Sequence, residues 1–83
     1  MVIKYFSWVR DIANTAEEII ELPANVNNIK ELIDYLILSN EKYHKIFKKR
    51  KVIKIAVNKI YVDEFKEIKN TDEIAFFPPV TGG

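Results

Sequence analysis

The first segment of the chain, residues 2–10, is rich in aromatic residues and in β-branched residues, and apolar side chains fall on both of its period-two sets. Both residue types are typical of a β-strand. Successive side chains of a strand point to opposite faces. One face then carries Ile3, Tyr5, Ser7 and Val9, and the other carries Val2, Lys4, Phe6 and Trp8. We expect one face to meet the core and the other to leave Phe6 and Trp8 exposed.

A second strand is predicted over residues 17–22, with Ile20 and Leu22 on one face. Pro23 ends it, because proline cannot donate to a sheet ladder. Asn14 marks a turn before this strand, since asparagine is the non-glycine residue that best tolerates a positive φ. The first two strands therefore form an N-terminal hairpin.

The clearest helix follows at Asn28, which can cap its N-terminus, with Glu31 three residues later in a pattern like a capping box. Apolar residues then recur at spacings of three and four, which is one stripe of a helix: Ile29, Leu32, Ile33, Leu36 and Ile37. We expect this helix to end near Asn40. A short helical turn over the edge of the core is predicted next, from the spacing of Tyr43, Ile46 and Phe47.

Three more strands are predicted over residues 52–57, 60–62 and 73–77, with turns at 58–59 and 70–72. Their alternation turns one set of side chains inward: Ile53, Ile55, Val57, Ile74 and Phe76. The element order is strand–strand–helix–strand–strand–strand, with one main helix. A single helix covers one face of a sheet, so the fold class is α+β in two layers.

Composition excludes several kinds of chemistry. The chain has 83 residues and a net charge of +1, which fits one small domain and says nothing about partners. It has no cysteine and one histidine, His44, so a standard transition-metal site is not expected. No internal glycine exists to build a phosphate loop. No apolar run approaches the length of about 20 residues that a membrane-spanning helix needs. We expect a soluble, cytoplasmic protein that does not bind membranes.

Two groups of charged residues have ordinary explanations. Glu17 and Glu18 would point to opposite faces of a strand and act as solubilising charges at the sheet edge. A basic run follows the helical turn: Lys45, Lys48, Lys49, Arg50, Lys51 and Lys54. We interpret it as a solvated loop. Contact with an acidic face of a partner is a weaker alternative, and a nucleic-acid-binding module is a third hypothesis that leaves the end of the chain unexplained.

Phe6, Tyr61 and Phe77 are predicted to lie on exposed faces of different strands. A contiguous group of exposed aromatic residues marks an interface. An error of one residue in the register of one strand would instead bury one of them. We predict a partner-binding surface at these residues.

The end of the chain combines two prolines, which stiffen it, with two glycines, which have no side chain. Its only two glycines are Gly82 and Gly83, where a chain of this length would carry about six in all. Pro78 and Pro79 make the preceding segment extended and stiff. Val80 and Thr81 can add main-chain hydrogen bonds in a partner's groove. This arrangement predicts a carboxylate threaded into a narrow site of another protein, where it becomes reactive after activation, for instance as an acyl-adenylate.

These residues resemble a known family. Residues 72–83, Asp-Glu-Ile-Ala-Phe-Phe-Pro-Pro-Val-Thr-Gly-Gly, are similar to the end of the MoaD-type sulfur carriers, the small subunits of molybdopterin synthase. Residues 6–10 and 56–58 support the resemblance, which spans essentially the whole chain. It implies a ubiquitin-like β-grasp domain over residues 1–77 and an extended tail over 78–83. Two turns that usually carry glycine in the family carry Asn14 and residues 70–72 here.

The resemblance also implies a function and partners. An E1-like enzyme would adenylate Gly83 with ATP, and a sulfurtransferase would supply the sulfur that makes a thiocarboxylate. The tail, residues 78–83, would then enter the large synthase subunit and donate sulfur to a pyranopterin precursor, in a heterotetramer of two small and two large subunits. Partner-binding residues would be Phe6, Arg10, Tyr61 and Phe77.

Catalytic side chains are expected on the large subunit, and this chain would bind no cofactor, metal or nucleic acid itself. Related carriers thiolate tRNA, serve thiamine synthesis or modify proteins. These roles remain alternatives.

Overall fold

The computed structural model describes residues 1–79 of the chain, which contain five strands, three α-helices and one 3₁₀ turn. The strands are β1 (Val2–Tyr5), β2 (Glu17–Ile19), β3 (Lys54–Val57), β4 (Ile60–Val62) and β5 (Glu73–Phe77). The α-helices are α1 (Ser7–Ala13), α2 (Ile29–Ser39) and α3 (Glu41–Phe47), and a 3₁₀ turn, η1, spans Arg50–Val52.

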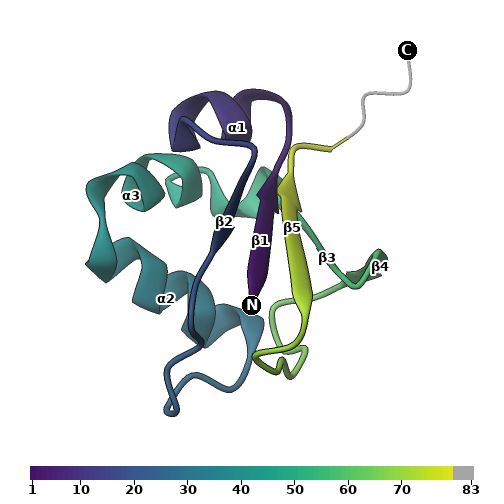
Figure 1. Cartoon of the computed structure of the whole chain (residues 1–83). Coiled ribbons are helices and arrows are strands. Elements are labelled where there is room, and N and C mark those ends of the chain that lie inside the picture. The colour runs from purple at the N-terminus through teal and green to yellow at the C-terminus, as the bar shows by residue number, and fades with distance from the viewer. Residues whose placement is uncertain (80–83) are drawn as a thin grey trace.

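The five strands form one mixed sheet in the order β2-β1-β5-β3-β4 (Figure 1). β1 runs parallel to β5, with Ile3 opposite Ile74 and Tyr5 opposite Phe76. The remaining neighbours are antiparallel. The first and last strands therefore lie side by side in the middle of the sheet. The expected two-layer α+β fold with a mixed sheet is confirmed.

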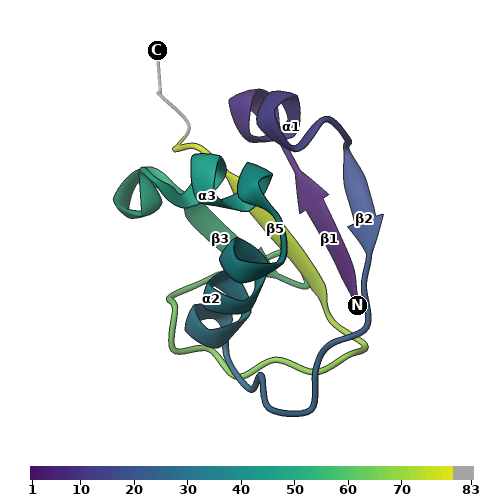
Figure 2. The same cartoon turned by 90° about the vertical axis from the view of Figure 1, so that its left-hand side faces the viewer.

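Helices cover one face of the sheet and leave the other open. Figure 2 shows α2 and α3 lying across the sheet, with α1 at the end where β1 finishes. The covered face and these helices form the core, in which Phe76 meets Phe47 edge to face at 5.0 Å between ring centroids. The fully buried side chains include Ile3, Tyr5, Ile29, Leu32, Ile33, Leu36, Ile46, Ile74 and Phe76.

The main helix, β4 and β5 match the expectations from the sequence, whereas β3 begins at Lys54 and not at Val52, because Arg50–Val52 form a 3₁₀ turn. The backbone N–H of Glu31 donates to the Asn28 side chain, as predicted for a capping residue. The side-chain carboxylate of Glu31 accepts a hydrogen bond from the backbone N–H of Asn27. In a standard capping box it would accept from the N–H of the capping residue itself, Asn28. Ile74 and Phe76 are buried, while Phe77 lies on the open face. β2 is shorter than predicted, although Ile20 still packs against the core.

The prediction of a strand over residues 7–10 is wrong, because α1 occupies them. The chain turns at Ser7, whose φ of 56° is incompatible with a strand. Val9 and Ala13, four residues apart, are then buried on one face of the helix. Trp8 leaves the sheet and packs partly buried against the core. The expectation of one main helix is therefore incomplete, since three α-helices are present in residues 1–79.

The interpretation of Glu18 as an edge charge is also wrong. Its carboxylate points towards α3, where it accepts hydrogen bonds from Lys42 Nζ at 2.6 Å and from the Tyr43 hydroxyl at 2.9 Å. The Tyr5 hydroxyl donates to Tyr43 at 3.0 Å. This polar network connects β1, β2 and α3. It satisfies hydroxyl groups that burial would otherwise leave without partners.

The network shifts the acidities of its members. Burial raises the pKa of Tyr43 to about 12 and raises the pKa of Tyr5 well above its ordinary range, and the neighbouring Glu18 carboxylate adds to both shifts. Burial alone would raise the pKa of Glu18, but the hydrogen bonds from Lys42 and Tyr43 and the charge of Lys42 outweigh it and lower that pKa. The carboxylate is thus held ionised and both hydroxyls are held neutral.

Candidate binding site at the end of the last strand

Three aromatic side chains meet on the open face of the sheet where β5 ends. Phe77 is 5.4 Å from Tyr61 and 6.5 Å from Phe6 between ring centroids, with the Phe6 ring edge-on to Phe77. These distances are within the range of favourable aromatic pairs. Phe6 is 47% exposed and Tyr61 is 72% exposed. We call Phe6, Tyr61 and Phe77 the aromatic platform. The predicted contiguous patch is present, and its role in binding a partner stays a prediction.

Strand register explains why these three residues meet. Tyr5 lies opposite Phe76 in the parallel pair, so the residues that follow, Phe6 and Phe77, emerge together on the open face. On the other side, Tyr61 of β4 lies opposite Ala56 of β3. Ala56 in turn lies opposite Ala75 of β5.

The two alanines were not recognised from the sequence as part of the site. Their small side chains on the open face leave room for Tyr61 to lean towards Phe77 across β3. The outward register of Ala75 was visible in the alternation of residues 73–77, but the pairing of Ala56 with Ala75 depends on contacts between distant segments.

The aromatic platform borders the start of the tail. Phe6, Tyr61 and Phe77 line an open hollow of about 520 Å³ together with Ser7, Ala75, Pro78 and Pro79. Pro78 is half-buried and Pro79 is exposed. Because proline fixes φ, these two residues set the direction in which the chain leaves the sheet. Val80, Thr81, Gly82 and Gly83 lie outside the described residues, and the division at residue 77 stays a prediction.

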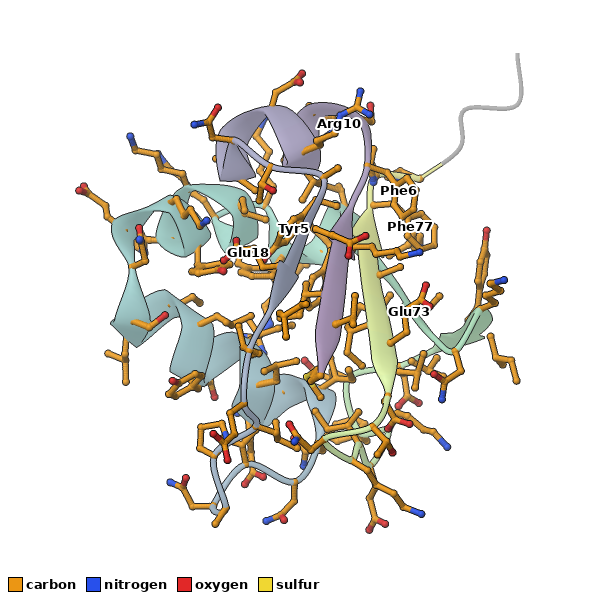
Figure 3. All side chains as sticks on the ribbon, viewed as in Figure 1. Tyr5, Phe6, Arg10, Glu18, Glu73 and Phe77 are labelled. Atoms are coloured by element: carbon orange, nitrogen blue, oxygen red, sulfur yellow. The ribbon has the colours of Figure 1, made fainter. Side chains whose placement is uncertain are left out.

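Charged groups lie around the platform. Figure 3 shows Arg10 on α1, at the same end of the molecule as Phe6 and Phe77. Arg10 is exposed, as is required of a residue that contacts a partner. Lys4 and Glu73 form an ion pair at 3.3 Å on the same open face, further along β1 and β5. The surface is therefore apolar at its centre and polar at its margin, which is the anatomy of a protein interface.

The described residues offer no catalytic or metal-binding constellation. His44 is exposed on α3. Within residues 1–79, no group of three or more His, Cys, Asp or Glu side chains is placed to hold a metal ion. The groups with perturbed pKa values belong to the network of Tyr5, Glu18 and Tyr43, on the covered side of the sheet. Of the helices in this part of the chain, none is long and apolar enough to cross a membrane.

The chain is similar to known proteins over almost its full length. A family model described as the ThiS family matches residues 3–83. The molybdopterin synthase sulfur carrier subunit of Haemophilus influenzae is 30% identical over 81 residues, which cover 98% of this chain and 96% of that protein. The corresponding subunit of Escherichia coli is 28% identical with the same coverage.

Solved structures share the fold. A putative molybdopterin converting factor subunit 1 from Pyrococcus furiosus has a TM-score of 0.73 and 34% identity, and the match covers 95% of each chain. A complex of subunits 1 and 2 of the molybdopterin-converting factor from Helicobacter pylori matches with a TM-score of 0.65 and 25% identity, covering 99% of this chain and 96% of that one. Small archaeal modifier protein 1 from Methanosarcina acetivorans matches with a TM-score of 0.66 and 26% identity, covering 99% and 94%.

Proposed function

This chain belongs to the ThiS family, and we propose that it is the sulfur carrier subunit of a molybdopterin synthase, with sulfur carried on the C-terminal glycine. The observation that carries the proposal is the aromatic platform at the point where the chain leaves β5. It gives a partner protein an apolar surface to hold directly beside the tail. The names of the relatives support sulfur carriage and synthesis of molybdopterin.

The proposed chemistry takes place at the carboxylate of Gly83. A carboxylate is a poor electrophile, so the oxygen must first be converted into a leaving group. Attack of the carboxylate on the α-phosphate of ATP gives an acyl-adenylate and releases pyrophosphate. Sulfide sulfur then attacks the acyl carbon, AMP leaves, and a thiocarboxylate remains. That sulfur is transferred to a pyranopterin precursor, and hydrolysis at the acyl carbon regenerates the carboxylate of Gly83.

The chain contributes binding and orientation to these steps. The aromatic platform and Arg10 hold the partner, and Pro78 and Pro79 limit the directions that the tail can take. Glycines 82 and 83 allow a narrow active site to close around the backbone. The side chains that move protons would come from the partner.

Two kinds of protein partner are proposed. The first is a large synthase subunit, because the Helicobacter pylori relative is a complex of subunits 1 and 2. We propose a heterotetramer with two copies of each. The second is an E1-like adenylating enzyme that uses ATP and works with a sulfurtransferase in the cytoplasm. No cofactor is proposed to be bound by this chain itself.

Mass spectrometry tests the proposal directly. The chain is incubated with the E1-like enzyme of its own genome, ATP and a sulfur source, and the intact mass is measured. We expect a gain equal to the exchange of one oxygen for one sulfur, located in the C-terminal peptide. A variant that lacks Gly83 should show no gain. An unchanged mass of the full chain, with an enzyme that thiolates its other known substrates, would contradict the proposal.

A protein modifier is the second candidate, favoured by the similarity to small archaeal modifier protein 1. Such a protein would form an amide between Gly83 and lysine side chains of target proteins. Digests of cells would then contain lysines that carry the Gly-Gly remnant, and these would disappear when the gene is deleted. Carriage of sulfur for tRNA thiolation or thiamine synthesis would instead appear as loss of those products in the same strain.

A further inference from the structure

A second surface at the end of the molecule where the tail leaves carries positive charge around the only tryptophan. Trp8 and Ile12 of α1 line a shallow hollow together with Lys45, Lys48 and Lys49, at the end of α3 and just beyond it. The tryptophan and isoleucine are half-buried, and the three lysines are exposed. We call these five residues the lysine shelf.

Helical spacing brings the members of the lysine shelf together. Trp8 and Ile12 are four residues apart on α1, so they share one face. Lys45 lies in the last turn of α3 and Lys48, three residues later, caps it with helical backbone angles, so these two share a face, while Lys49 lies just beyond the helix. A cation near a helix C-terminus is favourable, and this explains one lysine. It does not explain three lysines around an exposed apolar edge.

The charge of the lysine shelf is not compensated locally. Within residues 1–79, Lys45, Lys48 and Lys49 form no ion pair. No acidic side chain lines the hollow. The net charge of the whole chain is only +1, so the excess is local. Three neighbouring ammonium groups repel one another, and a partner with carboxylates would relieve that repulsion.

The volume of the hollow and its three lysines help to distinguish between a small anion, a nucleic acid and an acidic protein segment as the partner. Its volume of about 240 Å³ is below the roughly 300–1,000 Å³ of small-molecule sites. Three lysines can neutralise only a few phosphates, which gives weak binding to nucleic acid at ordinary salt. An acidic protein segment fits better, because its carboxylates can pair with the lysines while its apolar side chains cover Trp8 and Ile12.

We propose that the lysine shelf docks an acidic segment of the large synthase subunit, the partner that the complex of the Helicobacter pylori relative supports. This inference rests on the proposed function, since it assigns the segment to the same partner that holds the aromatic platform. Figure 2 shows why one partner can reach both: α1 lies at the end of the sheet where β5 stops and the tail begins. The lysine shelf would then extend the interface around α1.

The test uses the full chain and the large synthase subunit of the same genome. Calorimetry measures the affinity of the pair at low and high salt. The variant Lys45→Gln/Lys48→Gln/Lys49→Gln should bind the large subunit about tenfold more weakly and with a smaller dependence on salt. The matched control Lys59→Gln/Lys66→Gln/Lys69→Gln removes the same charge from exposed lysines elsewhere and should bind as the parent chain does.

Two further measurements separate charge from structure. Replacing the three lysines of the shelf by arginine keeps the charge and should keep the affinity. Because Trp8 is the only tryptophan, its ¹⁵N-labelled indole gives a single signal that should shift when the partner binds. An unshifted signal, or equal affinities of the glutamine variant and the parent chain for the large subunit, would overturn the inference and leave the proposed function standing.

The remaining outcomes are also decisive. If the parent chain does not bind the large subunit, the proposed function fails, and the inference fails with it. Bulk tRNA serves as a probe for the nucleic-acid alternative. Binding of tRNA that is lost in the glutamine variant, with partner affinity unchanged, would assign the lysine shelf to nucleic acid and overturn the inference.

Discussion

At the scale of single residues, the turns of the chain use non-glycine residues in the left-handed backbone region. Ser7, Asn14, Asn58 and Lys59 all adopt a positive φ, between 50° and 70°. Asparagine tolerates this region because its short side chain bonds locally, but serine and lysine adopt it at a cost. Asn58 and Lys59 form the two-residue turn between β3 and β4, and two positive φ values are the geometry of a type I′ turn.

Replacing Lys59 by glycine should therefore stabilise the protein. The change produces Asn-Gly, the preferred pair for this turn, and removes the strain of a Cβ at φ 70°. We expect the free energy of unfolding in urea to rise by about 1 kcal/mol. Lys59→Ala keeps the Cβ and should leave that free energy nearly unchanged. Equal values for the glycine and alanine variants would show that the turn is not strained.

At the scale of elements, the polar network decides where α3 lies. Lys42 and Tyr43 of α3 bind Glu18 of β2, and Lys42 also donates to the Ala13 carbonyl of α1 at 3.3 Å. Lys42 of α3 thus contacts both α1 and β2. The Lys42–Glu18 pair is about one quarter exposed on both sides, so it is more protected from water than the other ion pairs in residues 1–79.

This network should make stability depend on pH. The pKa of Glu18 is lower in the folded chain than in the unfolded chain, so the stabilisation is present above the unfolded pKa, about 4.3, and is lost as pH falls through the folded pKa. Glu18→Gln should lower the free energy of unfolding by about 1 kcal/mol at pH 7. It should have a smaller effect near pH 3.

The control for this experiment is Glu17→Gln, on the exposed side of β2. Urea denaturation of the three proteins across this pH range gives the comparison. A Glu18→Gln variant that loses stability by the same amount at both pH values would contradict the electrostatic account and leave only a packing effect.

The elements also show what the sequence could and could not predict. Alternation placed Phe6, Tyr61 and Phe77 outward, because the faces of a strand follow from local pattern alone. α1 was missed because Trp8 and Val9 have high β-propensity, although the spacing of Val9, Ile12 and Ala13 is helical. The role of Glu18 was not predictable, since its partners lie 24 and 25 residues away.

At the scale of the whole molecule, one face of the sheet packs against the helices and the other face stays open. The core lies entirely on the helical side, and the aromatic platform lies on the open side beside the tail. Changes on the open face can therefore alter binding while the core stays intact. This separation is what allows the proposed interface to be tested by substitution.

Phe77→Ala should weaken binding to the large synthase subunit by about 2 kcal/mol, because truncation of a central aromatic side chain has large effects at interfaces. Calorimetry of the purified pair measures the loss, and thermal unfolding of the free chain checks that the fold persists. Leu38→Ala is the matched control, since Leu38 is an apolar side chain that is 88% exposed on α2. Equal affinities of the two variants would show that the aromatic platform is not part of the interface.

The parallel pairing of β1 with β5 has a consequence for synthesis on the ribosome. β1 is translated first, yet its central neighbour spans residues 73–77, so the middle of the sheet cannot assemble until that strand has left the exit tunnel. Nascent chains that stop earlier keep Ile3 and Tyr5 without their partners and remain targets for chaperones and proteases. A chain that stops before residue 77 therefore lacks the central strand of its sheet and cannot present the aromatic platform in a folded domain.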